Sequence, residues 1–179
     1  MNIFNEGKEQ NIAQALNTKD KRVALQQKIF AKYPDQTLVD VNLNITGPIK
    51  KNNRFLEKLF NYGIKQLEAS WDKLGFAYKL VLSLDEDTGY ENFYILDLPI
   101  KKVKQTTIAF EDQAELGRLF DADVLVKDKN AAISRRDLGP SPRKCFICDR
   151  PAKECARSRR HSVAEMQDYI SELYAKNVK

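Results

Sequence analysis

The chain has 179 residues, of which 42% are hydrophobic and 31% charged, and its formal net charge is +5. This length fits one domain with a sizeable core, and the composition excludes a disordered chain, a collagen-like repeat or a coiled-coil rod as the main state. No stretch approaches the roughly 20 apolar residues of a membrane helix, and the first residues lack a secretory signal pattern. Three cysteines cannot all pair within one chain, which favours a reducing, cytoplasmic location.

The first half of the chain alternates between helical and extended patterns. Residues 5–33 carry apolar side chains at helical spacing, with a break expected at residues 17–20. Residues 37–46 alternate as a strand with one buried face, and Gly47-Pro48 ends it. Residues 53–74 predict an amphipathic helix, in which we expect the aromatic residues, Trp71 included, to be core.

The second half adds a hairpin and a terminal helix. Two β-prone runs flank an acidic turn, which predicts a hairpin, and a later stretch is ambiguous between helix and strand. These segments are residues 76–84 and 90–98 for the hairpin, 100–115 for the ambiguous stretch, 120–126 for a short strand and 163–174 for a helix that Ser162 and Glu165 cap. The sequence therefore predicts an α+β fold: a single domain over residues 1–179, with a mixed sheet and flanking helices.

The positive charge is concentrated in one segment. Residues 134–161 contain nine basic and three acidic residues, so this segment carries +6 and the rest of the chain −1. Seven of the nine basic residues are arginines, the side chain suited to bidentate phosphate contacts. A solvated basic face is the plainer interpretation. The same segment holds all three cysteines and the only histidine, which favours a functional role.

An acidic pair precedes this segment. Asp121 and Asp123 are two residues apart on a predicted strand, so their side chains point to the same face. Apolar Phe120, Ala122 and Val124 alternate with them and would form a buried opposite face. Two close carboxylates repel each other unless a cation lies between them, and Mg²⁺ takes such oxygen ligands together with substrate phosphates. A solvated strand edge is the alternative.

Two arginines and a cysteine–histidine cluster follow. Arg135 and Arg136 could bind a transferred phosphoryl group or a departing pyrophosphate, or they could be solvated residues of a turn. Farther on, the spacing is C-x2-C-x6-C, and a histidine follows after five residues. Such a Cys3His set can hold structural Zn²⁺, whereas the alternative is three half-buried thiols and a phosphate-binding histidine. The possible zinc ligands are Cys145, Cys148, Cys155 and His161.

Together, these motifs resemble one enzyme family. Residues 116–124 (LGRLFDADV), 134–135 (SR), 138–139 (LG), 143–148 (RKCFIC) and 155–161 (CARSRRH) resemble the citrate lyase holo-acyl-carrier-protein synthases, also called apo-citrate lyase phosphoribosyl-dephospho-CoA transferases. The likeness extends to the N-terminal half, through Arg22 with residues 25–27, residues 43–50, and Phe60 with Gly63.

The resemblance implies a nucleotidyltransferase. Such enzymes move the prosthetic group of citrate lyase from 2′-(5″-triphosphoribosyl)-3′-dephospho-CoA to a serine of the acyl carrier subunit, and pyrophosphate leaves. It implies that Asp121 and Asp123 hold Mg²⁺ and are catalytic. It further implies that basic residues bind the triphosphate, the phosphates of the dephospho-CoA part or the acidic carrier: Arg118, Arg135, Arg136, Arg143, Arg157, Arg159, Arg160 and His161.

The chain departs from the family pattern at one motif. The family usually has His-Pro directly before its Leu-Gly-Arg-Leu-Phe-Asp sequence, whereas this chain has Ala114 and Glu115, so no catalytic histidine is expected there. The Asp-x-Asp strand is similar to that of polymerase-β-type nucleotidyltransferases, but their Gly-Ser helix start is missing upstream. A polymerase-β-like nucleotidyltransferase core is therefore expected by analogy only.

Two other functions compete with this one. A zinc knuckle with an arginine-rich arm could bind nucleic acid, but two carboxylates facing the phosphates would repel the backbone. A non-catalytic maturation partner of citrate lyase would bind the carrier without any chemistry. Of these functions we expect the transferase, and we expect no membrane partner.

Overall fold

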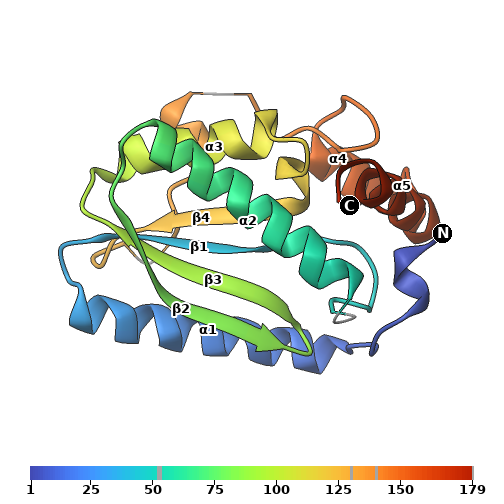
Figure 1. Cartoon of the computed structure of the whole chain (residues 1–179), viewed down its shortest axis with the longest axis horizontal. Helices are drawn as coiled ribbons and strands as arrows, with labels where there is room; N and C mark the ends of the chain where they lie inside the picture. Colours follow the sequence, from blue (N-terminus) through green and yellow to red (C-terminus); the bar gives the residue numbers. More distant parts are fainter. Residues whose placement is uncertain (52–53, 130, 140, 179) are drawn as a thin grey trace.

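The computed structural model describes residues 1–51, 54–129, 131–139 and 141–178. Within these residues, four strands form one sheet in the order β2-β3-β1-β4 (Figure 1). The strands are β1 (Thr37–Leu43), β2 (Tyr78–Glu86), β3 (Gly89–Leu96) and β4 (Phe120–Leu125).

Every described strand pair is antiparallel, so the predicted mixed sheet is wrong. The reason lies in the β2–β3 hairpin, which was predicted correctly. The hairpin reverses the chain, and it is β3 rather than β2 that pairs with β1. β4 then pairs with the other side of β1, again antiparallel. The α+β class itself is confirmed.

The sequence predicted where the helices lie better than how far each one runs. The predicted break at residues 17–20 is wrong, because one helix runs through this polar stretch and keeps it on the exposed side. The ambiguous residues 100–115 form a helix. The longer helices are α1 (Ile12–Lys32), α2 (Phe55–Lys73), α3 (Ile100–Gln113) and α5 (Val163–Asn177). The shorter ones are α4 (Ala152–Ser158) and the 3₁₀ turns η1 (Ile3–Asn5), η2 (Gly117–Leu119) and η3 (Arg135–Leu138).

Helix ends follow local capping chemistry. α5 begins at the predicted capping box, in which the Ser162 hydroxyl accepts from the Glu165 amide and the Glu165 carboxylate accepts from the Ser162 amide. A second box, formed by Asn11 and Gln14, starts α1. The predicted helix over residues 53–74 begins at Phe55 in the structure, and residue 53 itself lies outside the described residues.

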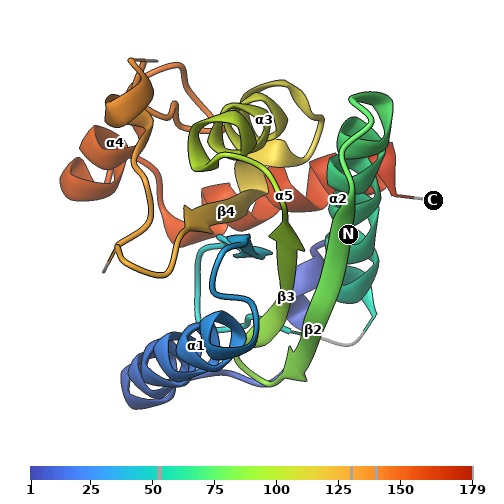
Figure 2. The ribbon, with the colours of Figure 1, turned by 90° about the vertical axis from the view of Figure 1, so that its left-hand side faces the viewer.

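The sheet lies between α1 on one face and α2 and α3 on the other (Figures 1 and 2), and an apolar cluster fills each side. On one face, Ile29 and Phe30 of α1 pack with Leu38 and Phe93. On the other face, α2 and α3 cover a larger core that includes Trp71, which is fully buried as predicted. α4 and α5 lie beyond the start of β4, and η1 packs against α5 through an Ile3 amide that donates to the Ser171 hydroxyl at 3.1 Å. None of the helices in the described part of the chain is long and apolar enough to cross a membrane.

The acidic pair lies on the edge strand, with both side chains on one face as the sequence predicts. Phe120, Ala122 and Val124 point into the larger core, so the alternate residues Asp121 and Asp123 project from the opposite face. Among the described residues, β4 has a strand neighbour on one side only. On its other side the Ile133 amide donates to the Val124 carbonyl at 3.0 Å and the Ala122 amide donates to Glu111 at 3.0 Å. Both carboxylates therefore lie on the α1 face of the sheet, on an edge strand.

Candidate functional site

A tight turn fixes the entry into β4. Gly117 opens η2, and a Cβ at this position would lie 2.0 Å from the Phe110 carbonyl oxygen at the end of α3. Only glycine permits this close approach. Leu116 and Leu119, on either side of Arg118, are fully buried. The half-buried Arg118 is therefore presented by a backbone that the core holds firmly.

Arg143 joins two of the predicted motifs at this point. Its guanidinium donates to the Asp121 carboxylate, to the Phe120 carbonyl and, at 3.0 Å, to the Arg118 carbonyl. In return, Arg118 Nη1 donates to the carbonyl of Cys145 at 2.5 Å. The structure thus places the cysteine-containing segment directly against the acidic strand, although the two are more than 20 residues apart in sequence.

A cavity of about 520 Å³ opens between this junction and the start of α5. Its size lies within the range of small-molecule sites. Asn44 lines it and donates to Asp121 Oδ1 at 3.3 Å, so two residues of the lining, Asn44 and Arg143, hold that carboxylate. The lining carries cationic, hydrogen-bonding and apolar groups: Arg118, Arg143, Lys144, Arg159, His161, Asn44, Thr46, Ser162, Cys145, Phe146, Ala152, Cys155, Ala156, Val163 and Met166.

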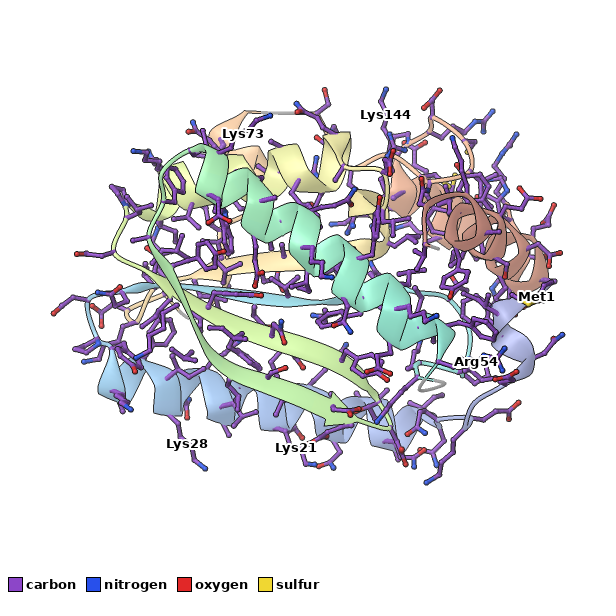
Figure 3. All side chains as sticks on the ribbon, viewed as in Figure 1. Met1, Lys21, Lys28, Arg54, Lys73 and Lys144 are labelled. Atoms are coloured by element: carbon purple, nitrogen blue, oxygen red, sulfur yellow. The ribbon has the colours of Figure 1, made fainter. Side chains whose placement is uncertain are left out.

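This lining suits an anionic ligand that also has apolar parts. Four of its side chains are basic, and no carboxylate is part of it among the described residues. Lys144 extends from the ribbon into solvent (Figure 3), and Arg159 is also exposed. Arg118 and Arg143 are instead half-buried and held by hydrogen bonds. The cavity therefore combines guanidinium groups held by hydrogen bonds with exposed cationic groups at its rim.

The Asp121–Asp123 pair is electrostatically strained. Loss of hydration in its surroundings raises the pKa of Asp123, and the nearby Asp121 carboxylate raises it further. Asp123 has no hydrogen-bond partner among the described residues, whereas Asp121 binds Arg143 and Asn44. A cation on the exposed side of this pair would relieve the repulsion.

Behind the pair lies an acidic group that our sequence analysis missed. Asp40, in register with Asp123, is 1% exposed, and it accepts a hydrogen bond from Gln26 at 2.9 Å. Arg22 of α1 pairs with both Glu91 and Asp40. Burial, and then the adjacent Glu91, raise the pKa of Asp40 well above its usual range. The available signal was an acidic residue within the apolar run of residues 37–43, on the face opposite Val39 and Val41.

The predicted phosphate-binding arginines divide into two groups. Arg118, Arg143 and Arg159 line the cavity together with His161. Arg135 does not, because it is 12% exposed and pairs with Glu111 at 2.7 Å and Asp112 at 2.8 Å. Glu111 also accepts from the Ala122 amide at 3.0 Å, so Arg135 ties η3 to α3, and Glu111 ties α3 to β4. The exposed Arg136, Arg157 and Arg160 lie outside the lining, and their phosphate contacts stay a prediction.

The structure brings the three cysteines and the histidine together. One ligand atom from each of Cys145, Cys148, Cys155 and His161 lies within 4.8 Å of all the others, so this cluster could hold a metal ion. Cys145 and Cys155 are buried, and the other two residues are half-buried. Hydrogen bonding from His161 lowers the pKa of the Cys148 thiol. The spacing alone predicted this grouping, and the fold confirms it.

Comparison with known proteins covers nearly the whole chain. Residues 10–177 match the family described as apo-citrate lyase phosphoribosyl-dephospho-CoA transferase. A probable apo-citrate lyase phosphoribosyl-dephospho-CoA transferase of Streptococcus pyogenes serotype M3 is 40% identical over 166 residues, which are 90% of this chain and 84% of that protein. The apo-citrate lyase phosphoribosyl-dephospho-CoA transferase of Citrobacter koseri is 31% identical over 156 residues, which are 87% of this chain and 84% of that protein. Protein CitXG of Leuconostoc mesenteroides subsp. cremoris is 34% identical over 97% of this chain, but over only 37% of its own length.

Proposed function

The chain belongs to the family of apo-citrate lyase phosphoribosyl-dephospho-CoA transferases, and we propose that it attaches this prosthetic group to the acyl carrier subunit of citrate lyase. The donor is 2′-(5″-triphosphoribosyl)-3′-dephospho-CoA. The hydroxyl oxygen of a carrier serine bonds to the phosphorus next to the ribose, and the bond from that phosphorus to pyrophosphate breaks. The serine hydroxyl proton passes to water, and a phosphodiester forms. The reaction is a nucleotidyl transfer.

The observation that carries this proposal is the basic cavity beside Asp121. A triphosphate has several negative charges, and guanidinium groups bind phosphate oxygens through parallel N–H donors. Within the part of the chain that the structure describes, Arg143 uses three of its five N–H donors on protein groups, and Arg118 uses one. Their remaining donors are free to bind phosphate in a fixed orientation. Charge that develops on the departing pyrophosphate would be stabilised by groups already in place.

The acidic pair would supply the other half of the site. Asp121 and Asp123 would hold Mg²⁺, which when bound neutralises charge at the phosphorus centre. Asp123 is exposed on the edge strand, where a carrier serine can reach it from solvent. The core of β4 would keep both side chains aligned, as in the polymerase-β-type nucleotidyltransferases to which we compare the strand.

The exposed arginines give the carrier a place to dock. Arg157 and Arg160 lie on or directly after α4, beside the rim residue Arg159. An acidic carrier protein or the phosphates of the dephospho-CoA part would be attracted to these charges, and the attraction would weaken as salt is added.

Asparagine variants of the acidic pair test the proposal. We expect Asp121→Asn and Asp123→Asn to reduce transfer by at least about 100-fold, because the loss of a charge-stabilising group costs about that much. Binding of the carrier should persist. Asp128→Asn, on the exposed loop after β4, is the matched control and should transfer normally. Near-normal transfer by either site variant would contradict the assignment. A wild-type protein that binds the carrier but never modifies it would be the non-catalytic partner instead.

A further inference from the structure

The cysteine–histidine cluster is built by three pieces of backbone. The segment around residues 143–152 folds back on itself: the Cys145 amide donates to the Arg150 carbonyl at 2.8 Å, and the Ala152 amide donates to the Arg143 carbonyl at 2.8 Å. Cys145 and Cys148 lie within this knuckle, which we define as residues 143–152. Cys155 follows on α4.

A left-handed turn then brings the histidine back to the cysteines. Arg159, which ends α4, has a φ of 47°, a conformation that costs a non-glycine residue about 1 kcal/mol or more. It is the one non-glycine residue of the described chain with a positive φ. The turn places His161 Nε2 3.3 Å from Cys148 Sγ. The backbone therefore accepts local strain at the step that completes the cluster.

We propose that Cys145, Cys148, Cys155 and His161 bind one structural Zn²⁺ ion. In a tetrahedral zinc site with bond lengths of about 2.3 Å to sulfur and about 2.0 Å to nitrogen, ligand atoms lie roughly 3.5–3.8 Å apart. The Cys148 and Cys155 sulfurs are 3.4 Å apart, and the four ligand atoms are all within 4.8 Å of one another. Small side-chain adjustments therefore suffice. Four protein ligands leave no open position, which marks the ion as structural rather than catalytic.

The composition of the surrounding segment explains why a metal is needed. Residues 143–161 contain seven basic and two acidic residues, and Phe146 and Ile147 are their only large apolar side chains. Such a segment buries too little apolar surface to offset its loss of chain entropy. Zn²⁺ with three thiolates and a neutral imidazole has a net charge of −1, which the basic surroundings stabilise. A disulfide would use only two of the three cysteines and would leave His161 without a role.

The ion would also hold the cavity in shape. Cys145 is a ligand through its sulfur, and its carbonyl accepts from Arg118. Cys155 and His161 line the same cavity, and Phe146 stacks on Tyr169 of α5 at 5.7 Å between ring centroids. One ion would thus tie the knuckle, α4 and the start of α5 to the first residues of β4. In this role the ion deepens the proposed function, whereas metal binding itself does not depend on that function.

The test measures metal in the full-length chain, purified under reducing conditions without a metal-affinity tag. Mass spectrometry of the metal content should find about one zinc per chain. A strong chelator should remove it and lower Tm, and added Zn²⁺ should restore Tm. Substitution by Co²⁺ should give the visible absorption of a tetrahedral thiolate complex. None of these readouts requires citrate lyase or the donor, so a failure of the metal site is distinguishable from a failure of the transferase proposal.

Variants separate metal binding from simple packing. We expect Cys148→Ser to lose most of the zinc, whereas His161→Cys should retain it, because four thiolates also form a structural zinc site. Lys153→Ala, on the exposed side of α4 beside Cys155, is the matched control and should keep the metal. Zinc-free wild-type protein that gains no thiolate absorption with Co²⁺ would overturn the proposal. An intact mass lower by two hydrogens, with the metal absent, would overturn it in favour of a disulfide.

Discussion

Replacing Arg143 by glutamine removes the contact that holds the knuckle to β4. The guanidinium makes one hydrogen bond to a carboxylate and two to backbone carbonyls. Bonds of these kinds contribute about 1.5–3 and about 0.5–1.5 kcal/mol each. The side chain is 21% exposed, so water can replace part of what is lost. We expect the free energy of unfolding to fall by about 2–3 kcal/mol.

For a domain of this size, that loss lowers Tm by about 5–10 °C. Thermal unfolding of Arg143→Gln measures it directly. The Tm of Arg143→Lys should fall nearly as far, because an ammonium group cannot reproduce the planar fork of N–H donors that a guanidinium presents. Arg136→Gln, on the exposed turn η3, is the stability control and should have the same Tm as the wild type. An unchanged Tm for Arg143→Gln would refute the view that this residue links the two motifs.

Further predictions concern the buried acidic residue, the glycine turn and pH. Asp40→Asn should raise the free energy of unfolding at neutral pH by about 1 kcal/mol, because it removes a poorly hydrated charge beside Glu91. A carboxyl whose pKa is raised in the folded protein stabilises the fold fully below its unfolded pKa, and this stabilisation is lost as the pH rises through the folded pKa. In acid, Asp40 is protonated and neutral like asparagine, so the stability gained by Asp40→Asn should vanish there. Denaturant titrations at two pH values check this. Gly117→Ala should cost at least about 2 kcal/mol, measured the same way, since its Cβ meets the backbone at Phe110; a wild-type stability would contradict the close packing. Protons and Mg²⁺ would compete for Asp123, so the acid limb of a pH–rate profile for transfer should move to lower pH as Mg²⁺ is raised; an acid limb that Mg²⁺ does not move would argue against its role as a ligand.

Local patterns predicted the parts of the site that depend on one strand or one helix end. The alternation in residues 120–126 was enough to place Asp121 and Asp123 on one face, because side-chain direction in a strand follows from position alone. The capping box at Ser162 is equally local. Cysteine spacing predicted the cluster because its members are separated by at most six residues.

Long-range pairing lay beyond such patterns. Arg135 looks like a phosphate ligand in sequence, but in the fold it meets Glu111 and Asp112 of α3, more than 20 residues earlier. The role of Arg143 depends in the same way on a contact with Asp121. The break predicted at residues 17–20 failed because this stretch holds no proline or glycine, so its weaker helix formers cost too little to interrupt a helix that Ile29 and Phe30 anchor at its far end.

The intact mass of the apo carrier subunit tests the central claim most directly. The carrier is incubated with this protein, Mg²⁺ and the triphosphoribosyl donor, and released pyrophosphate is measured in the same sample. We predict a mass gain equal to phosphoribosyl-dephospho-CoA on one serine, with an equal amount of pyrophosphate. An unmodified carrier in the presence of folded protein and intact donor would contradict the proposed transfer.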